Sequence, residues 1–281
     1  DPKLVAHVEK YEKIFQDRMQ IPIGYSDVEF ETRFSLVRTS EQNSSNFFAD
    51  IIRIAYGTEV AIFNSGSIRS DCTFHNGPLR MGDLQKMLPF IDIVLKVEVT
   101  GEQLLQTLEN GVSKYPIFEG RFPCVSGVRF AFDPKKEPMH RIDIGSVDIL
   151  GRGKLKLDEK YQVAVKYYMV LGRDGYEALM NAKQLITVEE ADDMTSMVRK
   201  FFELVNTAEF AEFIRVQEQK DKLMEGGKLT RPPLLRRTST SLKRQALIAQ
   251  FAPLISGATM VDDKRVISIN PQVDGRIKII E

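Results

Sequence analysis

Cysteine and histidine are scarce in this chain, which has two cysteines and three histidines among its 281 residues. The two cysteines, Cys72 and Cys124, allow at most one disulfide bond, whereas small secreted proteins typically depend on several. The cysteine content therefore favours a reducing, intracellular compartment, and whether the two residues pair is left open. The histidines, His7, His75 and His140, are isolated from one another in the sequence, which is typical of ordinary surface or packed residues.

The chain also lacks an excess of charge of either sign, a long apolar run and a starting methionine. It has 39 basic and 39 acidic residues, so no overall field favours nucleic acid or a membrane surface as a partner. No apolar stretch reaches about 18 residues, so no helical membrane span is expected. The opening residues, Asp1-Pro2-Lys3, suggest a trimmed or partial chain. The hydrophobic fraction of 43% is ample for the core of one large domain or two small ones.

A short apolar run is followed by small polar residues and then by one arginine. The run, Val60-Ala61-Ile62-Phe63, predicts a buried strand, and residues 64–71 predict a loop that a ligand could approach closely. Gly66 could adopt a positive φ, and the serines on either side of it would leave backbone N–H groups uncovered. Arg69 offers a planar set of donors suited to a phosphate or a carboxylate. Taken alone, this pattern is more typical of an ordinary turn with a surface arginine.

Two further motifs follow in a definite order. The first is Leu88-Pro89-Phe90, followed by a strand-like run at 92–99 and by Thr100-Gly101-Glu102-Gln103-Leu104; the second is the segment 167–176, from Tyr167 to Tyr176. In this order the chain resembles the C-terminal, substrate-binding domain of the 5′-nucleotidase and UDP-sugar hydrolase family, whose members are metal-dependent phosphoesterases that remove phosphate from nucleotides. The resemblance begins near residue 3 and fades near residue 205, and it also includes Arg38, residues 41–46 and residues 122–128.

The resemblance implies an α+β (mixed α/β) fold with four layers in the order α-β-β-α. It also implies three regions along the chain. Residues 1–20 would be a helix that links the substrate-binding domain to a catalytic domain, and residues 21–205 would be the substrate-binding domain itself. Residues 206–281 would be a helical extension, a basic linker and a C-terminal tail outside the family core.

Local patterns predict the individual elements. Apolar spacing predicts an amphipathic helix at 3–19, and alternation predicts strand over 21–38. Asn43 or Ser44 is a candidate cap for a helix that Gly57 ends. The remaining expectations are a strand at 59–63, a helix at 101–110 capped by Thr100 and stopped by Gly111, strands near 127–132, 142–150 and 160–168, a helix to Val205 begun by a Thr187–Glu190 capping box, a helix at 207–224, and short strands at 265–269 and 276–280.

A nucleotide presents a flat base, a ribose diol and a phosphate, so its site needs aromatic rings, a hydroxyl acceptor and cationic donors. The resemblance implies that Phe90 and Tyr168 stack on the base and that Asp174 binds the ribose. It places Asn64 near the substrate, and Gly66 keeps the loop backbone close to the ligand. Considered without the resemblance, Phe90 is typical of a core residue after a proline turn, and Asp174 is typical of an Asp-Gly turn.

The resemblance assigns Arg38 and Arg69 to the phosphate or ribose side, although each could instead be a surface charge or part of a structural ion pair. Arg173 departs from the family pattern because it stands in a motif that usually contains small residues. Its side chain could bind a second phosphate and so affect specificity, or it could pair with Asp174 and weaken ligand binding at the site. The base and the number of phosphates are not determined by the sequence.

The family hydrolyses its substrates with two divalent metal ions held by an N-terminal metallophosphoesterase domain. Its metal-binding motifs are Asp-x-His, Gly-Asn-His-Asp/Glu and His-x-His, and none of them occurs here. We therefore expect this polypeptide to bind a nucleotide or nucleoside without cleaving it, with no catalytic residue and no metal ligand of its own. The alternatives are a non-catalytic nucleotide-binding or regulatory module that retains the fold and an interaction scaffold acting through residues 188–281.

The stretch from Lys228 to Arg244 contains six basic residues and no acidic residue. It includes Arg236-Arg237-Thr238-Ser239, which resembles a site for a basophilic kinase with Ser239 as the acceptor. An exposed linker is the more ordinary interpretation of the same composition.

Overall fold

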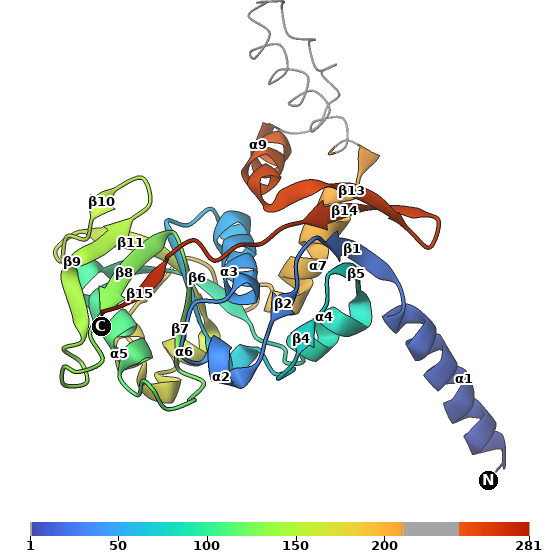
Figure 1. Cartoon of the computed structure of the whole chain (residues 1–281), viewed down its shortest axis with the longest axis horizontal. Helices are drawn as coiled ribbons and strands as arrows, with labels where there is room; N and C mark the ends of the chain where they lie inside the picture. The colour runs from blue at the N-terminus through green and yellow to red at the C-terminus, as the bar shows by residue number, and fades with distance from the viewer. Residues whose placement is uncertain (1, 209, 211–241, 281) are drawn as a thin grey trace, which may run out of the picture.

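The computed structural model describes residues 2–208, 210 and 242–280 of the chain (Figure 1). The mixed α/β class expected from the sequence is confirmed, because several sheets and helices pack together around a central five-stranded sheet. The strand order in that sheet is β12 (Lys183–Gln184), β6 (Val94–Thr100), β11 (Lys160–Lys166), β3 (Val60–Asn64) and β7 (Pro123–Ser126). Strand β11 runs parallel to β3 and antiparallel to β6.

One face of the central sheet is covered by two helices, α3 (Asn43–Tyr56) and α7 (Met194–Val205). Helix α3 contacts β3 and β7, and α7 contacts both α3 and a second sheet. The second sheet has the order β13-β14-β1-β5, formed by Ile255–Val261, Lys264–Ile269, Pro22–Ser26 and Gly77–Arg80.

The opposite face of the central sheet packs against α5 (Gly101–Val112) and a third sheet. Alternate residues of β3 point to opposite faces, as the two-residue period of a strand requires. Val60 and Ile62 belong to the core with α5, whereas Ala61 and Phe63 belong to the core with α3. The third sheet has the order β10-β9-β8-β15, formed by Gly153–Lys154, Ile142–Ile149, Val128–Phe132 and Ile277–Ile279.

The strongest local signals in the sequence correspond to observed helix ends. Gly57 adopts a left-handed conformation with φ of 57° and ends α3 as expected. Thr100 accepts a hydrogen bond from the Gln103 N–H and begins α5, also as expected. Contrary to the prediction, helix α5 continues past Gly111 to Val112. Gly111 instead allows close packing on Pro123, since an added Cβ would be 2.9 Å from the proline ring.

Three further local predictions are wrong. Residues 21–38 are not one strand but β1, the short β2 (Phe30–Glu31) and helix α2 (Phe34–Val37). Helix α7 begins at Met194 with Asp193 as its cap, and the Thr187–Glu190 hydrogen bond of 2.9 Å closes only a turn before it.

The predicted cap of α3 is also wrong, because Gln42 occupies the N-cap position, and its side chain makes no hydrogen bond to the N–H groups of the first turn. The Asn43 side chain is used elsewhere: its Oδ1 accepts from the Glu31 N–H at 3.2 Å and its Nδ2 donates to the Glu29 carbonyl at 2.6 Å. Asn43 therefore ties the start of α3 to the β2 segment.

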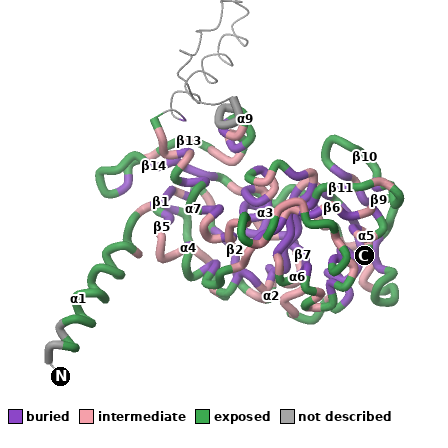
Figure 2. Tube along the Cα trace, turned by 180° about the vertical axis from the view of Figure 1, so that it is seen from behind, coloured by how far each residue is buried: buried purple, intermediate pink, exposed green. Residues whose placement is uncertain are grey.

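Helix α1 (Pro2–Met19) forms where the sequence predicts it and extends away from the sheets (Figure 1). Its apolar residues Leu4, Val8, Tyr11 and Phe15 are exposed, whereas buried residues gather around α3 and the central sheet (Figure 2). None of the helices in the described ranges is long and apolar enough to cross a membrane. Most of the predicted helix at 207–224 and most of the basic linker, including Ser239, lie outside the described residues.

The C-terminal segment joins both outer sheets. It comprises α9 (Leu242–Phe251), η4 (Ala252–Leu254) and strands β13, β14 and β15. Strand β14 pairs in parallel with β1, and β15 pairs in parallel with β8. The sequence places residues 206–281 outside the family core, yet these strands share its sheets.

Candidate functional site

A cavity of about 570 Å³ lies where three strands of the central sheet meet at one edge. The parallel strands β3 and β11 end there at Asn64 and Lys166. Strand β6 is antiparallel to β11 and pairs Val94 with Lys166, so the loop before β6 reaches the same edge. The cavity is lined by Asn64, Gly66, Arg69, Phe90, Ile91, Asp92, Gly120, Lys166, Tyr168 and Asp174. Six of the predicted site residues thus line one cavity, and Arg38 and Arg173 do not.

Two aromatic rings, those of Phe90 and Tyr168, line the cavity from distant parts of the chain. Phe90 is 49% exposed and Tyr168 is 40% exposed, so neither ring is buried in the core. The Arg69 guanidinium carbon lies 5.4 Å from the centre of the Phe90 ring, and the Lys166 Nζ lies 5.3 Å from that of Tyr168. Each ring therefore has a cation near one face, and both retain accessible surface on which a planar ligand could stack.

Asp174 is held at the cavity by both its side chain and its backbone. Its carboxylate accepts hydrogen bonds from the Tyr168 hydroxyl at 2.9 Å and the Asn64 Nδ2 at 3.0 Å. The Asn110 amide donates to the Asp174 carbonyl at 3.0 Å, and Asp174 adopts a left-handed φ of 55°. Burial and the bond to Asp174 raise the pKa of Tyr168, which keeps its hydroxyl a donor at neutral pH.

Asn64 provides an unpartnered acceptor in the cavity wall. The residue is 3% exposed, and its Oδ1 meets no hydrogen-bond donor in the described part of the chain. A buried polar atom without a partner costs about 1–3 kcal/mol. The Nδ2 of the same side chain donates to Asp174, so Asn64 serves to hold the Asp174 carboxylate in place.

Gly66 is required by close packing and not by its φ, which corrects the expectation of a positive value. A Cβ added at Gly66 would lie 3.2 Å from the Cα of Gly120, and the Gly66 N–H donates to the Gly120 carbonyl at 2.8 Å. The Ser65 N–H donates to the Phe122 carbonyl at 2.8 Å. The N–H groups of Ser65 and Gly66 are therefore occupied by the neighbouring loop, contrary to the prediction that they would be uncovered.

A buried ion pair at the cavity, Lys166 with Asp92, was not predicted from the sequence. Lys166 is 4% exposed, its Nζ lies 2.8 Å from the Asp92 Oδ2, and it donates to the Ser67 Oγ at 2.7 Å. Burial lowers the pKa of Lys166, while Asp92 opposes that change. Their sequence positions could have indicated a place at the site, because Asp92 is two residues after Phe90 and Lys166 is two residues before Tyr168.

Arg38 lies outside the cavity lining but within electrostatic reach of Arg69. Its guanidinium packs 3.8 Å from the centre of the Phe34 ring, and its Nη1 donates to the Phe118 carbonyl at 2.9 Å. Its Nε is buried and meets no acceptor in the described part of the chain. Burial lowers the pKa of Arg38, and the charge of Arg69 lowers it further. Two cations that repel each other would be relieved by an anion placed between them.

Arg173 is exposed and does not pair with Asp174 in the described structure, so the pairing that would blunt the site is not formed. The Asp174 carboxylate is instead engaged by Tyr168 and Asn64. The charge of Arg173 partly opposes the rise in the pKa of Tyr168 that burial and the bond to Asp174 cause.

The described residues include no group of three or more histidine, cysteine, aspartate or glutamate side chains that could hold a metal ion. His75 contacts Glu29 at 2.7 Å on the surface. Cys72 is exposed, Cys124 is buried, and the two are not paired in a disulfide. Burial raises the pKa of the Cys124 thiol to about 12.

Comparisons with known proteins agree with this architecture. Residues 22–181 match the family model described as 5′-nucleotidase, C-terminal domain. The chain is 28% identical over 188 residues to the trifunctional nucleotide phosphoesterase protein YfkN of Bacillus subtilis (strain 168), covering 65% of this chain and 13% of that protein. It is 27% identical over 199 residues to a 5′-nucleotidase of Diplobatis ommata, covering 65% and 34%.

The fold is also that of a solved structure. The 5′-nucleotidase precursor from Thermus thermophilus aligns with a TM-score of 0.65 at 21% identity. That alignment covers 97% of this chain and 42% of the other. The chain thus spans less than half the length of each of these similar proteins.

Proposed function

We propose that this chain, which belongs to the family of 5′-nucleotidase C-terminal domains, recognises the nucleotide or nucleoside substrate of a phosphoesterase. The observation that carries the proposal is the convergence of Phe90, Tyr168, Asp174, Asn64 and Arg69 on one cavity from separate parts of the chain. Its volume of about 570 Å³ is within the range of about 300–1,000 Å³ typical of small-molecule sites.

In this proposal each part of the ligand meets a different group of side chains. The base stacks between Phe90 and Tyr168, which contributes about 1–3 kcal/mol per stacked base. The ribose hydroxyls donate to Asp174, whose carboxylate is held by Asn64 and Tyr168. The phosphate lies on the side of Arg69, with Arg38 adding a second positive charge.

Hydrolysis in this proposal takes place in an N-terminal metallophosphoesterase domain of the same protein, outside the residues given. Two divalent metal ions bound there would activate water and stabilise the phosphoryl group. The role of the present chain is to bind and orient the nucleotide. The greater length of the relatives supports this division.

The first test is a calorimetric titration of the purified chain with adenosine, uridine and their 5′-monophosphates. We expect saturable binding that Phe90→Ala weakens by about 5- to 150-fold, which corresponds to the loss of one stacking contact. Tyr11→Ala is the matched control, because it removes an exposed ring on α1, away from the cavity lining. Binding that is equal in all three proteins would exclude this cavity as the site.

A second test separates recognition from cleavage. We expect purified 1–281 to release no phosphate from a nucleotide that it binds, and sustained release by a phosphatase-free preparation would contradict this. In a longer protein carrying the upstream domain, binding without metal-dependent release would instead support the non-catalytic alternative.

A further inference from the structure

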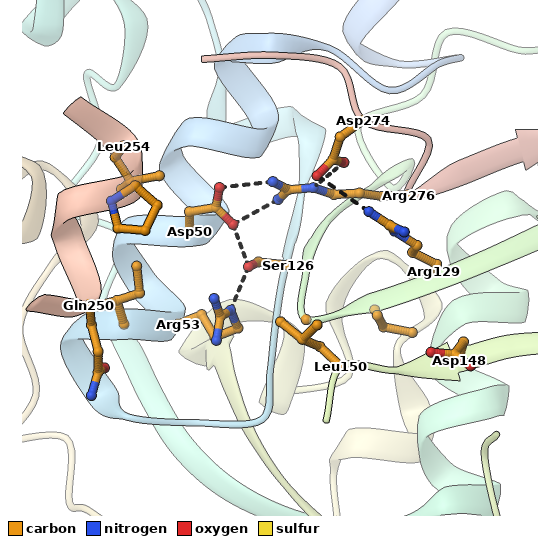
Figure 3. Close-up of a pocket in the computed structure, with 14 residues that line it drawn as sticks. Asp50, Arg53, Ser126, Arg129, Asp148, Leu150, Gln250, Leu254, Asp274 and Arg276 are labelled. Carbon is orange, nitrogen blue, oxygen red and sulfur yellow. Dashed lines mark hydrogen bonds and ion pairs between the residues drawn. The ribbon is translucent and has the colours of Figure 1, made fainter. Parts of the chain in front are cut away.

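A second cavity, of about 280 Å³, shares no lining residue with the one described above. It lies between α3, the junction of β7 and β8, strand β9 and the α9–η4 segment (Figure 3). Nucleotide recognition uses none of its side chains. Its walls therefore need a separate explanation.

A network of charged hydrogen bonds forms one side of this cavity. The Asp50 carboxylate accepts from both terminal nitrogens of Arg276, at 2.9 and 2.8 Å. The Ser126 hydroxyl donates to Asp50 at 2.5 Å and accepts from the Arg53 Nε at 2.7 Å (Figure 3). Asp50 is therefore neutralised by Arg276, and Ser126 stands between it and Arg53.

Arg53 is the under-satisfied member of the network. Only its Nε has a hydrogen-bond partner in the described part of the chain, so its two terminal nitrogens meet no acceptor there. Burial lowers the pKa of Arg53, the negative charge of Asp50 opposes that change, and the charge of Arg276 lowers the pKa further. A guanidinium in this state has four N–H donors free for an oxyanion, which is the ligand that matches its geometry.

The backbone leaves room for Arg53 to enter the cavity. Gly127 has a φ of 75°, and a Cβ added to it would lie 2.0 Å from the Glu59 carbonyl oxygen and 2.8 Å from the Arg53 Cδ. Any larger residue at position 127 would therefore clash with the Glu59 backbone and also crowd the Arg53 side chain. Figure 3 shows the guanidinium beneath Ser126, between Leu150 and the residues of the α9–η4 segment.

The other residues that line the cavity are partly exposed charged side chains and apolar side chains. Arg129 is loosely paired with Asp274 at 3.8 Å and is largely exposed. Asp148 is partly exposed on β9 and lies opposite Arg129 across the strand pair. The lining contains three arginines and three aspartates, so the anion-binding capacity rests on the free donors of Arg53 and not on a net positive charge. The apolar side chains are those of Ile54, Val128, Leu150, Pro253 and Leu254.

We propose that this cavity binds a small organic oxyanion, a carboxylate or a phosphate monoester, whose head group is held by Arg53 and whose short apolar body lies against Leu150, Pro253 and Leu254. Because the cavity is walled by α3 on one side and by the α9–η4 segment on the other, the ligand joins the nucleotidase-like domain to the C-terminal segment. Occupancy therefore stabilises the folded chain. The site is independent of the nucleotide proposal.

The test uses thermal unfolding and calorimetry at constant ionic strength with butyrate and butyl phosphate as probes. Acetate and inorganic phosphate have the same head groups without the apolar body, and butanol and butylamine have the body without the negative charge. We expect butyrate, butyl phosphate or both to raise the melting temperature in a saturable manner, with the other four compounds weaker or inactive. The tighter of the two probes identifies the head group.

Variants locate the binding. We expect Arg53→Gln to weaken it by about tenfold or more, since a charged hydrogen-bond donor is lost. Leu150→Glu, at a 66% exposed position, places a negative charge at the cavity without altering the buried network and is expected to weaken binding as well. Arg199→Gln removes a surface arginine outside this cavity and is expected to have no effect.

Three results would overturn the proposal. The first is the absence of binding by either probe, and the second is binding that neither Arg53→Gln nor Leu150→Glu alters. The third is loss of binding in Arg69→Gln with retention in Arg53→Gln, which would place the anion in the nucleotide cavity.

Discussion

The cavity proposed to bind a nucleotide and the junction with the C-terminal segment are both built from charged residues that come from distant parts of the chain. They differ in how fully their polar groups are hydrogen-bonded within the protein. At the junction, the Glu41 carboxylate accepts the N–H groups of Asp274, Arg276 and Ile277 at 2.9, 2.7 and 3.2 Å. Glu41 also accepts from Asn46 at 2.6 Å. The Glu41 carboxylate therefore has all its donors within the protein, unlike the Arg53 guanidinium at the neighbouring cavity.

In the cavity that contains Phe90 and Tyr168, the polar groups are only partly hydrogen-bonded within the protein. The Asn64 Oδ1 has no partner among the described residues, and the Phe90 and Tyr168 rings are about half exposed. Arg38 and Arg69 repel each other. Satisfied buried networks hold a fold together, whereas unsatisfied donors, acceptors and rings are free to bind a ligand. The free energy of unfolding should therefore depend on the Glu41 and Arg276 contacts at the junction, and the affinity for a nucleotide on the cavity that contains Phe90 and Tyr168.

The largest expected effect is on stability, from Arg276→Met. Arg276 is 9% exposed and binds Asp50 through two nitrogens, so its removal leaves a buried carboxylate without its cation. We expect a loss of about 3–5 kcal/mol in the free energy of unfolding, measured with denaturant. Arg129→Met is the matched control, because Arg129 is largely exposed and only 3.8 Å from Asp274. Equal losses of unfolding free energy in the two variants would show that the buried Arg276 contacts contribute no more to stability than the exposed Arg129 pair.

The second prediction concerns the buried pair of Lys166 and Asp92. We expect Lys166→Met to cost about 2–3 kcal/mol, because Asp92 loses its cation, and Asp92→Asn to recover part of this in the double variant. Independent effects of the two substitutions would show that the pair is not coupled.

The pH dependence of the same pair has a defined sign. Burial lowers the pKa of Lys166 in the native chain below that of an unfolded lysine, about 10.4. The unfolded chain therefore binds this proton more tightly, and the stabilisation of the wild type relative to Lys166→Met should rise with pH until about 10.4. Unfolding measured from about pH 8 to pH 10.5 checks this, and a flat or falling difference would contradict it.

A third prediction concerns the charge of the ligand. Arg69→Gln should weaken binding of a nucleoside monophosphate by about tenfold or more and that of the nucleoside far less, since a charge-assisted bond to phosphate is lost. Calorimetry with both ligands measures the ratio. Equal weakening of both would place Arg69 away from the phosphate.

The smallest expected effect is that of Tyr168→Phe. The ring that stacks on the base is retained, and only the hydroxyl that donates to Asp174 at 2.9 Å is lost. We expect nucleoside binding to weaken by about 1 kcal/mol, the value of one hydrogen bond. A loss as large as that of Tyr168→Ala would assign the role to the hydroxyl and not to the ring.

The sequence predicts those features that depend on local chemistry or on an ordered motif. The Gly57 helix end, the Thr100 cap and the strand before Asn64 depend on neighbouring residues and were predicted correctly. The convergence of Phe90, Tyr168 and Asp174 was expected only from the family resemblance, and their binding role stays a prediction.

Features that depend on tertiary contacts were missed. The alternation over 21–38 could not show that Asn43 ties the β2 segment to α3. The Lys166–Asp92 pair needs β6 and β11 in register before it can be seen. Glu41 and Arg276 are 235 residues apart, and no short-range pattern connects them.

The most direct test of the account is a crystal structure of the chain with a bound nucleoside monophosphate. We predict that the base lies between the rings of Phe90 and Tyr168, with the ribose at Asp174 and the phosphate toward Arg69. A nucleotide bound elsewhere on the chain, with both rings uncovered, would contradict the account.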